Sequence, residues 1–278
     1  MLVRQEAVEA LLDQGPGMLV RVESAKGSTP REAGAWMLVS EKRTLGTIGG
    51  GQLEYIATDA ARALLARGGV RQSLDVPLGP EIGQCCGGRT GLEVARAEGA
   101  TLERLLALVA KERAALPTVY ILGAGHVGRA LAAALALLPV RAVLVDGREE
   151  ELSMAPAGVE RVLTPLPEEN VRRAPPGSAF VVLTHDHALD FLIAREALAR
   201  GDAAYVGMIG SKTKRVSFHR WLREAGPVDT QPLVCPIGAA GRPDKRPEVI
   251  AAFVAAEIIQ SIAASQARPI EADRAHAG

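Results

Sequence analysis

The 278-residue sequence predicts an α/β protein with an N-terminal α+β domain followed by a Rossmann-like domain built on a doubly wound parallel sheet. Three observations lead to this prediction. Apolar strands alternate with helices through the second half, which is typical of a parallel sheet with right-handed crossovers. The segment "YILGAGHVGRALA" places a G-x-G-x-x-G pattern between a strand and a helix. The first half mixes short strands with longer helices, and Pro117 follows the helix that ends it.

The N-terminal domain is expected over residues 1–116. Apolar residues repeat with helical spacing over 3–14, from the glycines at 49–51 to Gly68, and in "TLERLLALVAKERAAL". Strands are predicted in "GMLVRVESAKGSTP", which leaves into a turn, and in "AWMLVS", "TLGTI", residues 70–76 and "TGLEVARAE".

The second domain is expected over residues 117–268, with a flexible tail at 269–278. Its predicted strands are "TVYILG", "RAVLVDG", "VERVL", "AFVVLTHD", "AAYVGMIGS" and "PLVCPIG". Helices are predicted after the first of these strands, over 189–200, up to residue 226 and over 247–264.

Composition limits the classes of function. Lys plus Arg equals Asp plus Glu at 32 each, so no overall basic field attracts nucleic acid. Three cysteines do not make a disulfide framework, which favours a reducing compartment. The N-terminus lacks a signal-peptide apolar core, and the most apolar helical run, 130–138, is too short to cross a bilayer. We therefore expect a cytoplasmic protein that binds neither nucleic acid nor membrane.

The glycine pattern predicts a phosphate site. Gly123 permits a tight turn, Gly125 lets backbone amides approach a phosphate, and Gly128 allows close packing of helix on strand. The following helix N-terminus adds free N–H groups and a partial positive charge. Asp146 lies 18 residues after Gly128, near the spacing of an acid that binds the ribose of NAD. The alternative is a tight turn that binds nothing.

The cluster "THDHALD" is a candidate for acid–base chemistry at the end of a predicted strand. It contains His185, Asp186, His187 and Asp190. Such residues equally cap helices or satisfy loops, so both interpretations stay open. The other three histidines, which include His126, lie apart in sequence, and no metal-ligand set stands out.

Four further loops have the composition of anion clamps, with glycines, hydroxyls or cations, and three of them precede predicted helices. Their candidate residues are Ser28, Thr29 and Arg31; Gly49, Gly50 and Gly51; Gly210, Ser211, Lys212, Lys214 and Arg215; and Gly238, Gly241, Lys245 and Arg246. Together with the glycine fingerprint they predict a large, multiply anionic ligand held between two domains.

The segment "GQCCGG" indicates thiol chemistry or contact with a soft metal. Neighbouring side chains point apart, so Cys85 and Cys86 are not expected to chelate one metal together. Flanking glycines, which include Gly87, keep the loop open. The alternative is that both cysteines only pack, as Cys235 is expected to do in its apolar strand.

Taken together, these motifs resemble the XdhC/CoxI family of accessory proteins for xanthine dehydrogenase and related molybdenum hydroxylases. The matching segments, between residues 20 and 257, are "GSTPREAGAWMLV", "GTIGGGQLE", "QCCGG", "ILGAGHVGRALA", "THDHALD", "YVGMIGSKTKR" and "CPIG". The resemblance implies a chaperone instead of an enzyme. It implies binding and protection of molybdenum cofactor (Mo-molybdopterin), support of its sulfuration by a cysteine desulfurase, delivery to apo-xanthine dehydrogenase or a related hydroxylase, and a homodimer.

The resemblance also implies a set of cofactor-binding residues. They are Ser28, Arg31, Gly49, Gly50, Gly51, Gln84, Cys85, Cys86, Gly87, Gly123, Gly125, His126, Gly128, Asp146, His185, Asp186, Gly210, Ser211, Lys212, Arg215 and Gly238. Cys86, which begins the widely shared "CGG", is the thiol expected at the metal. On this interpretation the glycine fingerprint holds the cofactor phosphate instead of NAD. The alternatives are an NAD(P)-dependent oxidoreductase that uses Asp146 and the "THDHALD" histidines, and a nucleotide-sensing regulatory module.

Overall fold

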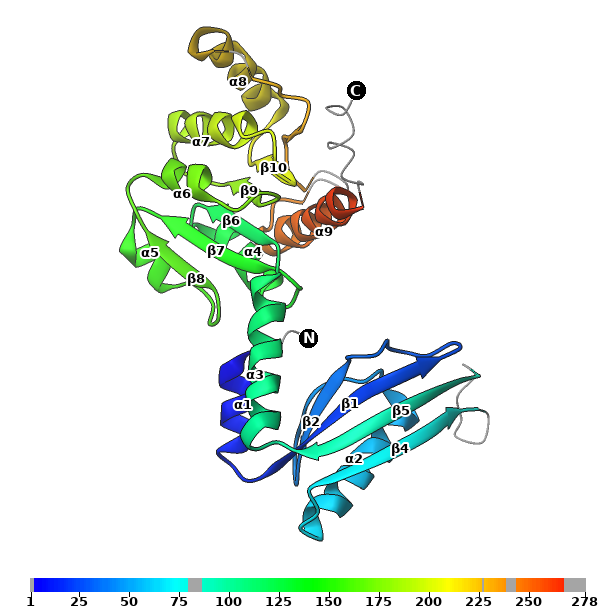
Figure 1. The fold of residues 1–278 in the computed structure, drawn as a ribbon. Helices are drawn as coiled ribbons and strands as arrows, with labels where there is room; N and C mark the ends of the chain where they lie inside the picture. Colours follow the sequence, from blue (N-terminus) through cyan, green and yellow to red (C-terminus); the bar gives the residue numbers. More distant parts are fainter. Residues whose placement is uncertain (1–2, 80–86, 227, 239–243, 268–278) are drawn as a thin grey trace, which may run out of the picture. The chain divides into compact units, whose positions relative to one another are not determined.

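The computed structural model describes residues 3–79, 87–226, 228–238 and 244–267 (Figure 1). The chain forms two compact units, Met1–Ala115 and Leu116–Gly278. Each unit has its own sheet and its own hydrophobic core.

Unit 1 is an antiparallel sheet with helices on both faces. The strand order is β3-β2-β1-β5-β4. Its elements are α1 (Gln5–Leu12), β1 (Gly17–Lys26), β2 (Trp36–Ser40), β3 (Thr44–Gly46), α2 (Gly51–Ala66), β4 (Arg71–Leu78), β5 (Gly88–Arg96) and α3 (Gly99–Ala114).

The alternation of side chains along β2 separates the two cores of unit 1. Met37 and Val39 pack in the cluster that α2 covers. Trp36 and Leu38, on the opposite face, pack in the cluster formed with α1 and α3. Even-numbered and odd-numbered residues of β2 are therefore both apolar, as expected for a strand that is buried on both faces.

Unit 2 is a six-stranded parallel sheet with the order β11-β10-β9-β6-β7-β8. Numbered within the unit this is 3-2-1-4-5-6, the order of the dinucleotide-binding Rossmann fold, and it confirms the predicted doubly wound sheet. Its strands are β6 (Thr118–Leu122), β7 (Arg141–Asp146), β8 (Glu160–Leu163), β9 (Ala179–Val182), β10 (Tyr205–Met208) and β11 (Leu233–Val234). Its helices are α4 (His126–Leu135), α5 (Glu149–Ser153), α6 (Pro167–Arg173), α7 (His187–Ala199), α8 (Lys212–Ala225) and α9 (Pro247–Gln266).

The helices of unit 2 cover both faces of its sheet (Figure 1). On one face α4, α5 and α9 share a buried cluster with Val119 and Val181. On the other face α6, α7 and α8 pack around Phe180 and Val182. Successive residues of β9 thus enter opposite cores, and its four residues are all buried.

By length and composition alone, α9 is the one helix in the described part of the chain that could cross a membrane. It is longer than the apolar run at 130–138, which is too short to cross a bilayer. A core helix passes the same test, and α9 packs against α4 and β10. Its buried side chains are Ala251, Val254, Ala255, Ile258 and Ile262.

Several predicted boundaries need correction. The first helix covers Gln5–Leu12 instead of 3–14, and Gly15 with φ near 144° follows it. The helix predicted over 189–200 begins at His187, because Asp186 caps it. The short helices α5 and α6, of five and seven residues, were not predicted.

Close packing of α4 on β6 explains Gly128. A Cβ atom added to this residue would lie 1.9 Å from the carbonyl oxygen of Gly123. We expect Gly128→Ala to lower the free energy of unfolding of unit 2 by about 2 kcal/mol or more, because backbone must move to admit the methyl group. Urea denaturation followed by circular dichroism measures the loss.

Gly125→Ala is the matched control. A Cβ atom there meets no atom within 4 Å, and the residue has φ −66°. Its loss should stay under about 1 kcal/mol. Equal losses in the two variants would contradict the steric explanation of Gly128.

Candidate functional site

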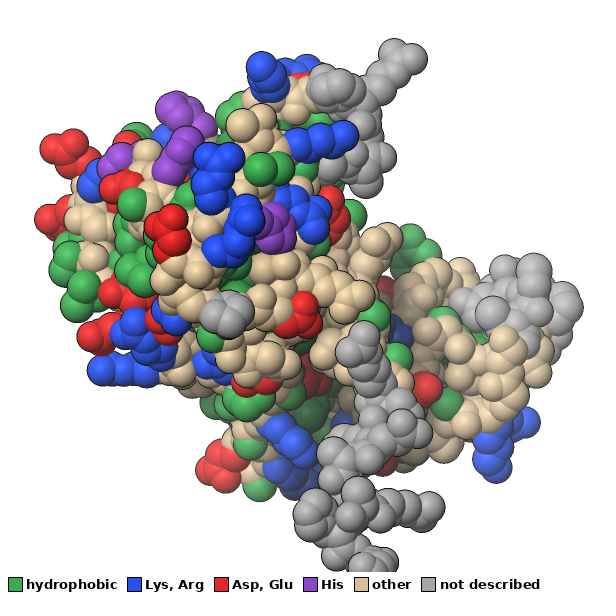
Figure 2. Space-filling view, turned by 90° about the horizontal axis from the view of Figure 1, so that it is seen from above, with side chains coloured by type: hydrophobic (Ala, Val, Ile, Leu, Met, Phe, Trp, Pro, Cys, Tyr) green, Lys and Arg blue, Asp and Glu red, His purple; other side chains and the backbone are tan. Residues whose placement is uncertain are grey.

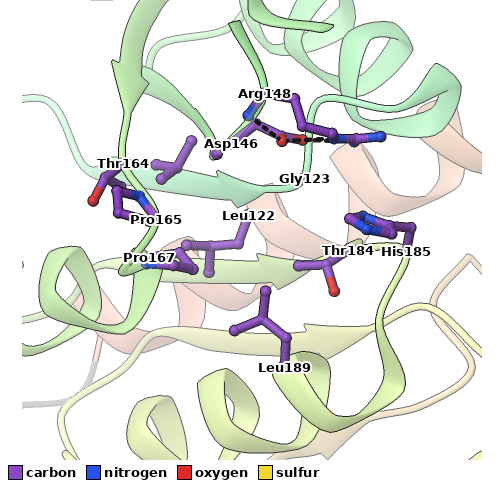
Figure 3. Close-up of a pocket in the computed structure, with 12 residues that line it drawn as sticks. Leu122, Gly123, Asp146, Arg148, Thr164, Pro165, Pro167, Thr184, His185 and Leu189 are labelled. Carbon is purple, nitrogen blue, oxygen red and sulfur yellow. Dashed lines mark hydrogen bonds and ion pairs between the residues drawn. The ribbon is translucent and has the colours of Figure 1, made fainter.

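The parallel strands of unit 2 end at one edge of the sheet, and β6 is the point from which successive strands proceed in opposite directions. Ligands of open α/β sheets bind at such a point. A pocket of about 170 Å³ lies there (Figure 3). Its lining residues are Leu122, Gly123, Val145, Asp146, Gly147, Arg148, Thr164, Pro165, Pro167, Thr184, His185 and Leu189.

Three of the predicted site residues line this pocket: Gly123, Asp146 and His185. The other lining residues were missed because only their positions, at or just beyond the ends of strands, distinguish them in the sequence. The prediction that ligand-facing residues follow strand ends would have found most of them.

The glycine turn leaves the start of α4 open to a ligand. Gly123 has φ near 126°, and a Cβ atom there would lie 2.4 Å from the carbonyl oxygen of Leu183. Gly125 is the N-cap residue of α4, has no side chain to cap the helix, and faces open space. No acidic side chain lies in the first turn, where His126 is exposed. The free amides and the helix dipole favour an anion here.

Both oxygens of the Asp146 carboxylate accept hydrogen bonds from groups of the protein itself. Its Oδ1 accepts hydrogen bonds from the backbone N–H and Nε of Arg148, both at 3.0 Å. Its Oδ2 accepts from the Ala124 N–H at 2.7 Å and from Nη2 of Arg148 at 2.9 Å. Four donors fill the roughly four acceptor positions of a carboxylate. Burial raises the pKa of Asp146, but the bonds from Arg148 and Ala124 outweigh it and hold the pKa below its usual value.

This geometry corrects the expectation for Asp146. A ribose hydroxyl would donate a hydrogen bond to the carboxylate, and it would first have to displace Arg148. Asp146 therefore binds the protein's own turn and arginine, instead of standing free for the ribose of NAD.

The "THDHALD" cluster does not form an acid–base pair. Asp186 is the N-cap of α7 and accepts bonds from the N–H groups of Ala188 and Leu189, which lower its pKa. Asp190 is fully buried. His185 is exposed at the pocket, and His187 is exposed in the first turn of α7.

Asp190 joins the ends of two neighbouring strands. Its Oδ1 accepts from the N–H of Thr184 at 3.0 Å and from its hydroxyl at 2.6 Å, just after β9. Its Oδ2 pairs with Nζ of Lys214, which follows β10. The side chains of Asp190 and Lys214 are 0% and 8% exposed. Lys214 is thus a buried structural partner, which corrects its expected role as a cation for a ligand.

The other residues predicted around α8 keep a surface position. Ser211 caps α8 by accepting from the N–H of Lys214 at 3.2 Å. Lys212 is exposed and Arg215 is half-buried. A Cβ atom on Gly210 would lie 2.5 Å from Cδ of Lys214, so this glycine makes room for the lysine stem. Lys, Arg and His side chains gather on this face of unit 2 in Figure 2.

Gly238 is not among the residues that line the pocket. It follows β11 with φ near 64°, and a Cβ atom there would approach the Ile250 carbonyl oxygen of α9 at 3.3 Å. Cys235, three residues earlier, is a buried free thiol. Burial raises its pKa, against the lowering effect of Lys214 and Arg215. No group of three His, Cys, Asp or Glu side chains placed to hold a metal occurs within the described ranges.

In unit 1 the structure brings three predicted segments together. Ser28 forms a β-bridge with Gly87, and Gly49 packs on Pro30, whose Cγ would lie 2.6 Å from an added Cβ atom. Arg31 lines a second pocket of about 170 Å³, together with Trp36, Thr47 and Glu112 among others. Gln84, Cys85 and Cys86 lie outside the described residues.

The glycine loop of unit 1 already holds an anion, the carboxylate of Glu54. Its Oε1 accepts from the N–H groups of Ile48 and Gly50, at 3.0 and 2.9 Å, and from the Thr47 hydroxyl at 2.5 Å. Burial raises the pKa of Glu54, but these bonds outweigh it and lower the pKa overall. The amides of Ile48 and Gly50 are therefore not free for an external anion, which corrects the expectation for the loop at Gly49, Gly50 and Gly51.

Two family profiles match the chain. Residues 119–258, half of its length, match the profile described as the XdhC Rossmann domain. Residues 4–75 match the profile of the XdhC and CoxI family. The matches cover both units and confirm the resemblance inferred from the motifs.

Individual relatives are more distant. The uncharacterized protein YqeB of Escherichia coli (strain K12) is 27% identical over 273 residues, which cover 94% of this chain and 46% of YqeB. The chain thus spans about half the length of this relative. A Bacillus halodurans protein, whose crystal structure is described as that of a xanthine dehydrogenase, has a TM-score of 0.73 at 19% identity, over 96% of this chain and 97% of that one. At this identity the likeness shows the fold alone.

The buried pair at Asp190 can be tested by its stability. Lys214→Met leaves the carboxylate buried without its cation, and we expect the free energy of unfolding to fall by about 3–5 kcal/mol. Adding Asp190→Asn, which removes the charge, should recover much of this loss. Exposed Lys212→Met, two residues away, should change stability by less than about 0.5 kcal/mol. Urea denaturation compares the variants, and a Lys214→Met protein as stable as Lys212→Met would exclude a structural role for the pair.

Proposed function

The chain belongs to the XdhC and CoxI family, and on this premise we propose that it is an accessory protein that binds and protects molybdenum cofactor and delivers it to a molybdenum hydroxylase. In this proposal the client is apo-xanthine dehydrogenase or a related enzyme, and a cysteine desulfurase supplies sulfur while the cofactor is held. The protein itself carries its ligand without turning over a metabolite. It works in the cytoplasm as a homodimer.

One observation carries the proposal: the open glycine turn lies beside a pocket whose acid is already saturated. Gly125 leaves the amides at the start of α4 accessible, which suits the terminal phosphate of molybdopterin. The adjoining pocket has mainly apolar walls, which suit a flat ring. The four donors on Asp146 leave this carboxylate no free acceptor for a ribose hydroxyl, which is the contact expected of the acid at this spacing in an NAD-binding protein.

The residues of this chain have separate tasks in the proposal. The amides after Gly125 hold the phosphate, and Lys212 and Arg215 add positive charge on the same unit. When bound, the metal supplies the redox chemistry that the client hydroxylase uses. Cys86 is the thiol proposed to lie at the metal, on the basis of its place in "QCCGG". Ser28, Arg31 and Gly87, which lie in one region of unit 1, are proposed to flank it.

The first test is the content of the purified protein. From a host that makes molybdopterin, the wild-type chain should carry pterin and molybdenum, measured by fluorescence of the released, oxidised pterin and by metal analysis. Gly125→Val should lower the pterin content about tenfold or more, equivalent to about 1.4 kcal/mol, because its side chain blocks the approach of a phosphate to the amides. Gly125→Ala should give an intermediate loss. Stoichiometric nicotinamide with no pterin would instead indicate an NAD(P)-dependent protein.

A second test separates the two neighbouring cysteines. Cys86→Ser should keep the fold, since the change is nearly isosteric, and should lower the yield of active, sulfurated hydroxylase reconstituted from cofactor-loaded protein. Cys85→Ser is the matched control and should lower it less. Circular dichroism checks folding of both variants. Transfer at the wild-type level by folded Cys86→Ser would exclude a role for this thiol.

A further inference from the structure

The pocket at the β6 edge has mainly apolar walls. Leu122 and Val145 come from the strand ends, Pro165 and Pro167 from the loop after β8, and Leu189 from α7. In Figure 3 the side chain of Leu189 points from α7 toward the part of the pocket that Leu122 lines. The cavity, about 170 Å³, is smaller than the roughly 300–1,000 Å³ of sites for whole drug-sized ligands. It therefore suits one apolar or flat group of a larger ligand.

Arg148 brings a rigid planar group to this pocket. Two of its guanidinium nitrogens, Nε and Nη2, donate to the two oxygens of Asp146 at 3.0 and 2.9 Å. The Arg148 N–H donates to the same carboxylate, so side chain and backbone are held together. Asp146 is only 7% exposed, whereas Arg148 is 41% exposed. The carboxylate engages the edge of the guanidinium, and a guanidinium whose edge is engaged still offers its faces to a ring.

The position of Arg148 favours a role for its flat guanidinium group in ligand contact over a role for its positive charge. The Asp146 carboxylate neutralises the charge at close range, which weakens any role as a phosphate-binding cation. The turn proposed to bind the phosphate is the neighbouring glycine turn, where Gly125 faces open space. In Figure 3, Arg148 and His185 lie above and below the Gly123 turn, and both line the pocket. A ring that enters the pocket between these groups would have its phosphate arm near α4.

We propose that this pocket binds a flat heterocycle attached to a phosphate-bearing arm, and that Arg148, held by Asp146, is the residue that selects the ring by stacking on it. Two sources offer this chemistry: the pterin of the cofactor and the purine of a nucleotide. The inference rests on the proposed function only for the choice between them.

Binding of free rings to the full chain tests the proposal. The probes are pterin, followed by its own fluorescence, and AMP, followed by calorimetry, with ribose 5-phosphate as an arm that has no ring. We expect one of the two ring probes to bind and ribose 5-phosphate to bind much more weakly. Arg148→Lys keeps the charge and removes the plane, and it should weaken ring binding about 3- to 30-fold. Arg148→Gln keeps a planar amide without charge and should weaken it less.

Arg141→Lys is the matched control, because Arg141 lies at the start of β7, whereas Arg148 follows the end of this strand. Arg141 pairs with the exposed Glu160. Arg141→Lys should leave binding unchanged, and circular dichroism should show every variant folded. Failure of both ring probes to bind, or Arg148→Lys binding like wild type, would overturn the inference. Arg148-dependent binding of AMP, in a protein that carries no pterin, would support the stacking pocket and refute the proposed function. If Arg148→Lys carries a normal amount of cofactor and neither ring probe binds the protein, the stacking pocket is refuted and the proposed function is supported.

Discussion

The buried carboxylate of Asp146 is the interaction on which the candidate site depends. It accepts a hydrogen bond from Ala124 in the glycine turn and three from Arg148, so one side chain joins the ends of β6 and β7. Asp190 does the same across the switch point, where it joins the ends of β9 and β10 through Thr184 and Lys214. Two internal carboxylates therefore hold the ends of the strands at this edge of unit 2.

The fold could be predicted because its signals extend over many residues. The strand, glycine turn and helix around Gly123 have a pattern that few other structures share, and five further apolar strands follow it in order. The five-residue α5 and seven-residue α6 were missed, since they are too short to show a helical repeat. The boundary of α7 depended on one capping contact of Asp186, which composition does not reveal.

The site was predicted less well, because spacing indicates where an acid lies and not what it binds. Asp146 has the spacing of a ribose ligand, yet Arg148, two residues later, takes its acceptors. Glu54 had a signal that could have been used: an acid in the first turn of a helix can reach back to the N-cap amide, as in a capping box. Its bond to Gly50 is of this kind. Lys214 looked like one of several surface cations, and only tertiary structure shows that it is buried.

Internal hydrogen bonds and an ion pair occupy both buried carboxylates at this edge of unit 2. A carboxylate that accepts four hydrogen bonds, with its pKa held below the usual value, is a weak base and cannot readily withdraw a proton from a neighbouring molecule. Asp190, paired with Lys214 and bonded to Thr184, is similarly committed. The acid that lines this pocket is thus occupied by the protein's own groups, and it is poorly placed to take a proton from a bound molecule.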